Sequence, residues 1–192
     1  MKTIAGEINI KLKNKLFLNL KSFLRPRIES WIITDLSLKN RLFKLCGFDA
    51  SQKLDLLYRG SLHGFKSSDF HSKCDNIPKT LTIIKATSGN VFGGYTEATW
   101  ESGISIKSDK CAFIFSLVNK ENAPIKVKIA NGKEHGAIYT DLSYGPVFGT
   151  TTGNDIWIGA DSKSNYSNSS SFGHNYIHPN YPAGSEKANS FL

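Results

Sequence analysis

Two pairs of side chains in the sequence have a spacing that occurs among metal ligands. His71 and Cys74 are three residues apart, and His174 and His178 are four apart. If residues 69–74 are helical, His71 and Cys74 share one face of the helix, which suits packing as well as ligation. A zinc ion needs three or four ligands within tetrahedral reach, and neither pair has an obvious companion in the chain. The sequence therefore predicts no metal site.

The three cysteines, Cys46, Cys74 and Cys111, offer thiol chemistry. They are far apart and form no Cys-x-x-Cys pair, which argues against a disulfide framework or a zinc knuckle. A reactive thiol needs a helix N-terminus or an adjacent cation to lower its pKa, whereas Cys74 is followed by Asp75. We expect reduced, buried thiols, and we keep a redox-active enzyme that uses Cys74 or Cys111 as the alternative.

Familiar catalytic and nucleotide-binding motifs are absent. The chain contains no Gly-x-Gly-x-x-Gly, Gly-x-x-x-x-Gly-Lys-Ser/Thr, Gly-x-Ser-x-Gly or His-Glu-x-x-His sequence. Arg59 lies beside Tyr58 and has the chemistry to bind an anion, although pairing with a nearby carboxylate is commoner. We predict no catalytic residue and no cofactor, and the pattern favours a protein that is not an enzyme.

The formal charge of +8 is concentrated at the start of the chain. Residues 1–45 carry ten Lys/Arg and three Asp/Glu, whereas residues 46–192 carry fourteen and thirteen. A nucleic-acid-binding fold normally has a basic face in its body, and this body is nearly neutral. We therefore expect no nucleic-acid partner.

A basic amphipathic helix is predicted over residues 8–24, because Leu12, Leu16 and Leu20 recur at helical spacing with lysines to the side. The favoured interpretation of residues 1–27 is a helix packed on the body or a tether. The alternative is a membrane-peripheral module that is anchored by residues 8–24. The start of the chain lacks an unbroken apolar core of the signal-peptide kind, so we expect a cytoplasmic protein.

A second helix is predicted over residues 30–45, with Ser30 as its N-cap and Gly47 after its end. Short runs rich in β-branched and aromatic residues follow, which predict strands. A third, short helix is expected over residues 69–74. The expected strands cover residues 54–59, 81–85, 91–96, 112–117, 125–129, 137–140, 155–159 and 172–177, with long loops over 143–154 and 161–171.

These elements predict an α+β fold in which two mainly antiparallel β-sheets form a sandwich flanked by short helices, with two helices at the N-terminus. Gly93 and Gly94 lie inside an apolar run, where glycine marks a bulge, a bend or a close backbone approach.

Several ordered motifs resemble the TLDc domain of the oxidation-resistance proteins. They include Leu56-Leu-Tyr-Arg-Gly-Ser61, Phe92-Gly-Gly-Tyr-Thr96 and Ser143-Tyr-Gly-Pro-x-Phe-Gly149. The positions that carry the resemblance are Arg59, Gly64, Phe65, Phe70, His71, Asp75, Phe92, Gly93, Gly94, Trp100, Tyr144, Gly145, Pro146, Phe148, Gly149, Asp155, Phe172 and Gly173. We interpret them as mainly structural, with some of them on an interaction surface.

The resemblance implies a non-catalytic protein-interaction module that protects against oxidative stress inside the cell. It also implies binding to, or regulation of, the vacuolar proton-pumping ATPase through one of its subunits. It brings no established catalytic residues.

Two departures from the family pattern stand out. Relatives often carry an Arg-Asp pair where this chain has Leu62 and His63, so the resemblance does not carry a function of that acidic residue over to this chain. Relatives also continue past a segment like residues 185–192 into a last strand. We therefore expect a TLDc-like domain over residues 28–192 that lacks this strand and leaves a sheet edge unpaired.

Overall fold

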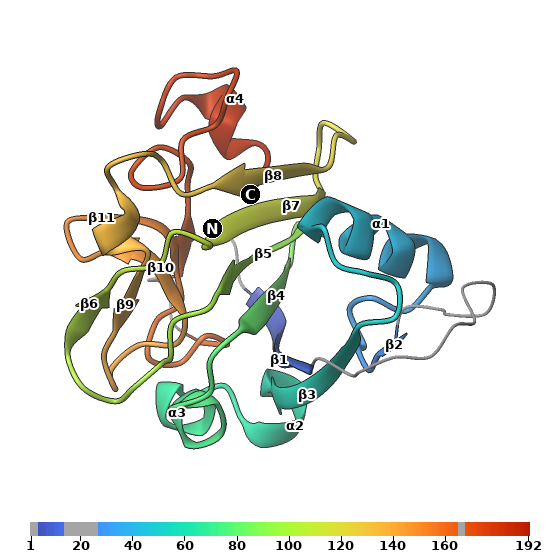
Figure 1. Ribbon diagram of the computed structural model, residues 1–192, viewed down its shortest axis with the longest axis vertical. Coiled ribbons are helices and arrows are strands. Elements are labelled where there is room, and N and C mark those ends of the chain that lie inside the picture. The colour runs from blue at the N-terminus through green and yellow to red at the C-terminus, as the bar shows by residue number, and fades with distance from the viewer. Residues whose placement is uncertain (1–3, 14–26, 165–167) are drawn as a thin grey trace.

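A computed structural model describes residues 4–13, 27–164 and 168–192 of the chain. Their strands form two sheets that pack against each other (Figure 1). The seven-stranded sheet has the spatial order β2 (Arg27–Ile28), β3 (Lys53–Arg59), β1 (Ile4–Lys13), β4 (Thr80–Ala86), β5 (Val91–Thr96), β7 (Phe113–Val118) and β8 (Ile125–Lys128). The five-stranded sheet has the order β12 (Ser169–Ser170), β11 (Gly153–Trp157), β10 (Val147–Thr150), β9 (Ile138–Thr140) and β6 (Ser105–Lys107).

All neighbouring strands are antiparallel except β2 and β3, which are parallel. The predicted fold class, an α+β sandwich of two mainly antiparallel sheets, is therefore confirmed. The helices are short: α1 (Leu36–Cys46), α2 (Gly60–His63), α3 (Ser67–Cys74), α4 (Glu186–Asn189) and the 3-10 turn η1 (Glu134–Gly136).

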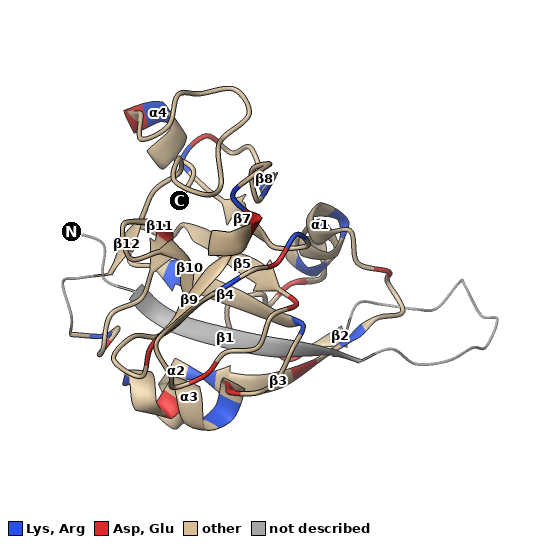
Figure 2. Ribbon diagram, turned by 60° about the vertical axis from the view of Figure 1, so that its left-hand side comes forward, with Lys and Arg blue, Asp and Glu red and all other residues tan. Residues whose placement is uncertain are grey.

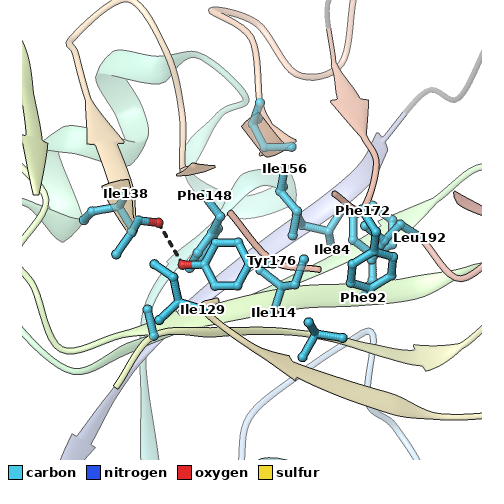
Figure 3. Packing of buried hydrophobic residues seen from close by; sticks show 14 of the residues in the cluster. Ile84, Phe92, Ile114, Ile129, Ile138, Phe148, Ile156, Phe172, Tyr176 and Leu192 are labelled. Carbon is cyan, nitrogen blue, oxygen red and sulfur yellow. Dashed lines mark hydrogen bonds between the residues drawn. The ribbon is translucent and has the colours of Figure 1, made fainter. Parts of the chain in front are cut away.

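Two hydrophobic clusters lie on opposite faces of the seven-stranded sheet, because neighbouring residues on a strand point to opposite sides. On β4, Ile84 faces the cluster between the two sheets, and Ile83 faces the cluster that α1 covers. Figure 3 shows the inter-sheet cluster, where Tyr176 packs among aliphatic side chains and donates its hydroxyl proton to the Ala137 carbonyl oxygen at 2.8 Å. Leu192 is buried in this cluster as well.

Gly93 and Gly94 allow two close approaches within the sandwich. A Cβ atom on Gly93 would lie 1.9 Å from the backbone oxygen of Thr82 on the neighbouring strand β4, and one on Gly94 would lie 2.5 Å from the Phe148 ring of the other sheet. The prediction of a close approach is confirmed. The register irregularity of β5 falls between Val91 and Phe92, ahead of the glycines.

The predicted helix over residues 8–24 is wrong for residues 8–13, which belong to β1; residues 14–26 lie outside the described part of the chain. The segment Ile8-Asn-Ile-Lys-Leu-Lys13 alternates apolar and polar residues, and this period of two fits a strand better than the leucine spacing fits a helix. The N-terminal part therefore has one described helix, α1, instead of two. β1 pairs with β3 on one side and with β4 on the other, so it joins these two strands within the seven-stranded sheet.

The predicted helix over residues 30–45 begins later than expected. Asp35 is its N-cap and accepts a hydrogen bond from the Leu38 amide at 2.8 Å. Ser30 instead accepts hydrogen bonds from the amides of Ile32 and Ile33, so it forms a turn ahead of the helix. Gly47 ends the helix in the left-handed conformation, with φ of 78°, as predicted.

Three further predictions about strands need correction. The expected loop over residues 143–154 contains β10 and the start of β11, and the loop over 161–171 contains β12. Residues 172–177, expected as a strand, form none. Phe172 and Tyr176 are apolar because both enter the inter-sheet core from a loop, so their spacing does not report strand periodicity.

Candidate functional site

His71 joins helix α3 to the loop between β9 and β10. Its Nδ1 lies 2.6 Å from the Asp75 carboxylate, and its Nε2 lies 3.0 Å from the carbonyl oxygens of both Asp141 and Tyr144. Ser102 donates its hydroxyl proton to the second Asp75 oxygen at 2.7 Å. The imidazole is buried, with 4% of the residue exposed.

This arrangement contains a serine, an aspartate and a histidine, but its order is not that of a catalytic triad. In a triad the histidine faces the serine hydroxyl and is free to take its proton. Here Ser102 bonds to Asp75, and both nitrogens of His71 face oxygen acceptors. Both ring nitrogens of His71 are thus taken up by partners within the chain, so the ring connects α3 to the loop between β9 and β10 and does not face the Ser102 hydroxyl.

Asp155 lies in the middle of β11 and is completely buried. Its Oδ1 accepts hydrogen bonds from the amides of Gly173 (2.9 Å) and His174 (3.1 Å), and its Oδ2 accepts from those of Asn175 (2.8 Å) and Tyr176 (3.2 Å). Burial raises the pKa of Asp155, and the four backbone N–H groups act in the opposite direction by stabilising the carboxylate. The carboxylate therefore organises a loop, and none of its oxygens is directed at a ligand.

Arg59 contacts an exposed indole ring. Its guanidinium carbon lies 4.3 Å from the centre of the Trp31 ring, and Nη2 donates to the Glu29 carbonyl oxygen at 3.3 Å. No carboxylate pairs with it among the described residues, contrary to the commoner arrangement expected from the sequence. Leu62 and His63 stand where relatives often carry an Arg-Asp pair; Leu62 is 60% exposed, and His63 Nδ1 accepts the Arg59 amide at 3.0 Å.

Gly64 precedes Phe65 in a tight turn between α2 and α3. Gly64 has φ of 105°, and a Cβ atom there would lie 2.1 Å from Asp69 Oδ2, which accepts the Lys66 amide at 3.1 Å. The Tyr58 hydroxyl donates to the Gly64 carbonyl at 2.6 Å. The turn thus has space for glycine alone.

Phe70 and Trp100 form the centre of an aromatic chain in the core. Phe70 meets Trp100 edge to face at 5.5 Å, and Trp100 meets Phe148 at 5.8 Å, so the chain links α3 to the second sheet. The indole nitrogen of Trp100 donates to Thr80 Oγ1 at 2.9 Å. Phe70, Trp100 and Phe148 are all buried, so their rings pack the core.

Residues 144–149 place a second aromatic group on the outer face of the five-stranded sheet. Tyr144 lies 4.3 Å from Trp157, ring centre to ring centre, and Trp157 stacks with Tyr139 at 6.2 Å. Gly145 and Pro146, which follow Tyr144, are buried. Gly149 has φ of 107°, and a Cβ there would meet the Gly153 carbonyl oxygen at 2.6 Å.

The three cysteines occupy different environments. Cys46 and Cys74 are buried, whereas Cys111 is exposed, contrary to the expectation that all three are buried. Burial raises the pKa of Cys46 to about 12, so its thiol stays protonated near neutral pH.

The described residues include no group of three or more His, Cys, Asp or Glu side chains that could hold a metal ion. His174 is exposed, and His178 is buried among Phe172, Tyr181 and Phe191.

Exposed aliphatic side chains gather at one edge of the five-stranded sheet, and sequence reasoning missed them. Ile104 is 78% exposed, Ile106 is 50% exposed and Leu142 is 49% exposed. Ile104 directly precedes β6, and Ile106 is the middle residue of this strand. A strand of three residues is too short to show a periodic pattern in the sequence. Lys/Arg and Asp/Glu positions are interspersed around α2, α3 and α4 (Figure 2).

A protein-family model matches most of the chain, and two known proteins match shorter segments of it. A model of the family described as "TLDc domain" matches residues 28–191. Human "Interferon-induced protein 44" is 36% identical over 52 residues, which cover 27% of this chain and 12% of that protein. Zebrafish "MTOR-associated protein MEAK7" is 27% identical over 62 residues, or 32% of this chain and 14% of that protein. The aligned segments thus span a small part of both relatives.

None of the described helices has the length and apolar character to cross a membrane.

Proposed function

The chain belongs to the TLDc domain family, and from this premise we propose that it is a non-catalytic protein-interaction module. The proposed role is protection against oxidative stress through a protein partner. The proposed partner is a subunit of the vacuolar proton-pumping ATPase, which the family resemblance implies.

The observation that carries the proposal is how the polar groups at the family positions are used. His71, Asp75 and Asp155 direct their nitrogens and oxygens at backbone groups and at other side chains of the chain itself. A general base or nucleophile must reach the substrate, and none of these three does so. The edge of the five-stranded sheet instead exposes three aliphatic side chains, Ile104, Ile106 and Leu142, and exposed apolar groups are a property of interaction surfaces.

The similarity to zebrafish MEAK7 also supports an interaction role, because the name of that protein describes it as associated with mTOR. Both matched relatives are much longer than the aligned segments. What this chain shares with them is therefore a module, and the partner of this module is the part we propose.

Titration of the purified protein against the purified vacuolar proton-pumping ATPase, followed by biolayer interferometry, tests the proposal. We expect saturable binding with a dissociation constant of about 1 μM or tighter, as for a specific complex. An unrelated β-sandwich domain of similar size serves as the control. Peroxide consumption, measured on the same sample, tests the thiol-based alternative. Peroxide turnover that is lost in Cys111→Ser, without binding to the pump, would overturn the proposal.

A further inference from the structure

Strand β6 forms an open edge of the five-stranded sheet. Of the described strands, β9 alone pairs with it, and β6 lies at the outer margin of the molecule in Figure 1. An edge strand presents unpaired backbone N–H and C=O groups, to which an extended peptide can add as a further strand. Natural proteins usually protect such an edge with charge or with proline.

The side chains of β6 do not protect this edge. Ile104 and Ile106 are exposed. Lys107 is the lysine of the strand, but its ammonium group is held by Glu101 at 2.8 Å and by Thr99 Oγ1 at 3.1 Å. Its charge is therefore neutralised within the chain, and the edge stays open to a partner strand.

On the outer face of the sheet, Ile106 begins a row of apolar side chains, of which Tyr139 and Val147 are buried. Ile106 lies opposite Tyr139, which lies opposite Val147, which lies opposite Trp157. Residues that lie opposite each other point to the same face of a sheet. A side chain of an added strand that lies opposite Ile106 would therefore point to the same outer face.

A pocket of about 370 Å³ adjoins the same isoleucine. It is lined by Ile106, Lys133, His135, Thr150, Thr151, Thr152, Gly153, His174 and Asn175. The lining includes one lysine and two histidines and contains no aspartate or glutamate. The side chains of Lys133, His135 and His174 form no ion pair with the described residues. The pocket therefore complements a negative charge.

We propose that the β6 edge and this pocket together bind an extended, apolar segment of a partner protein that carries one acidic side chain. The segment pairs with the backbone of β6, and its carboxylate enters the pocket beside Lys133. A residue two positions away points to the same side of the strand and packs against Ile104. This assignment rests on the proposed function as an interaction module, and it specifies the surface and the chemistry of the partner.

A synthetic peptide tests the assignment without knowledge of the natural partner. The probe is a fluorescent peptide of about nine residues, a common strand length, that alternates valine and threonine around one central glutamate. Its control has glutamine in place of the glutamate. Fluorescence anisotropy with the full chain should give a dissociation constant for the glutamate peptide about tenfold lower than for the glutamine peptide, with the difference decreasing at high salt.

Three variants locate the binding. Lys133→Glu should weaken binding of the glutamate peptide about tenfold. The same variant should bind a peptide with a central lysine more tightly than the wild type does. Ile104→Lys should weaken all peptides, because a charge on an edge opposes strand addition. Lys120→Glu makes the same charge change in the exposed turn between β7 and β8, and it should leave binding unchanged. Because these side chains are exposed, all three variants should keep the melting temperature of the wild type.

The assignment is wrong if neither peptide binds, if glutamate and glutamine peptides bind equally, or if Lys133→Glu behaves like Lys120→Glu. Its failure can be told apart from failure of the proposed function. If the wild type binds the proton pump and Ile104→Lys and Lys133→Glu bind it equally well, the function stands and the surface is wrong. If the peptides bind as expected and the pump does not, the surface stands and the pump is the wrong partner.

Discussion

The substitution Asp155→Asn tests the claim that residues at the family positions build the fold. The Asp155 carboxylate accepts four backbone hydrogen bonds, two at each oxygen, from the loop of residues 173–176. Asparagine has nearly the same shape but one oxygen fewer. Whichever way the amide is turned, its NH₂ group faces two backbone N–H donors, so two of the four hydrogen bonds are lost.

The size of the effect follows from these two bonds. A hydrogen bond to a charged group contributes about 1.5–3 kcal/mol, so the loss of two predicts roughly 3–6 kcal/mol. Removing the buried charge relieves some desolvation cost, since burial is the main cause of the raised pKa of Asp155. We therefore expect the low end, about 3 kcal/mol, and a fall in melting temperature of roughly 6–12 °C for a domain of this size.

Circular dichroism during heating, together with urea unfolding, measures the change. Asp35→Asn is the matched control, because Asp35 is exposed and caps α1 through one backbone amide; asparagine caps helices as well as aspartate does. A melting temperature of Asp155→Asn within about 2 °C of the wild type would refute the assigned role, since it would correspond to less than one lost hydrogen bond.

Three further predictions follow from single contacts. Gly94→Ala should lower the free energy of unfolding, measured in urea, by about 1–3 kcal/mol, because the new methyl group overlaps the Phe148 ring. The control is Gly103→Ala, which should change the free energy of unfolding very little, because no neighbour lies closer than 4.0 Å to the new methyl group. Burial lowers the pKa of His178 below its usual 6.5, so the folded state binds this proton less tightly than the unfolded state. The free energy of unfolding should therefore fall as the pH drops through 6.5. The substitution His178→Asn should flatten this part of the profile of stability against pH. Native protein should react with a thiol reagent at Cys111 while Cys46 and Cys74 stay protected, since both are buried; labelling that persists in Cys111→Ser would contradict this.

The strands of the larger sheet were largely predictable from sequence, because their side chains combine high β propensity with turn residues at both ends. Residues 81–85 and 91–96 are examples, and both match β4 and β5 to within one residue at each end. The prediction was wrong for residues 8–13. There, a leucine spacing that favoured a helix competed with an alternating pattern, and pairing with β3 and β4 selected the strand.

The organisation around Asp155 could not be predicted, because it depends on a loop that is distant in sequence. The apolar residues Phe172 and Tyr176 suggested a strand, whereas the structure turns the intervening backbone amides toward one carboxylate. The exposed surface at β6 was also missed. A three-residue edge strand has no periodicity of its own, and its exposure depends on where the sheet ends.

Quantitative affinity purification after chemical crosslinking in cells tests the central claim most directly, namely that this fold acts by binding a protein. The full chain and an unrelated β-sandwich domain serve as parallel baits, and mass spectrometry identifies and counts what each retains. The account predicts a protein bound to this chain in near-equal amount, absent from the control bait and reduced in Ile104→Lys and Lys133→Glu. A folded bait that retains the same proteins as the control, together with peroxide turnover by the purified chain, would contradict it.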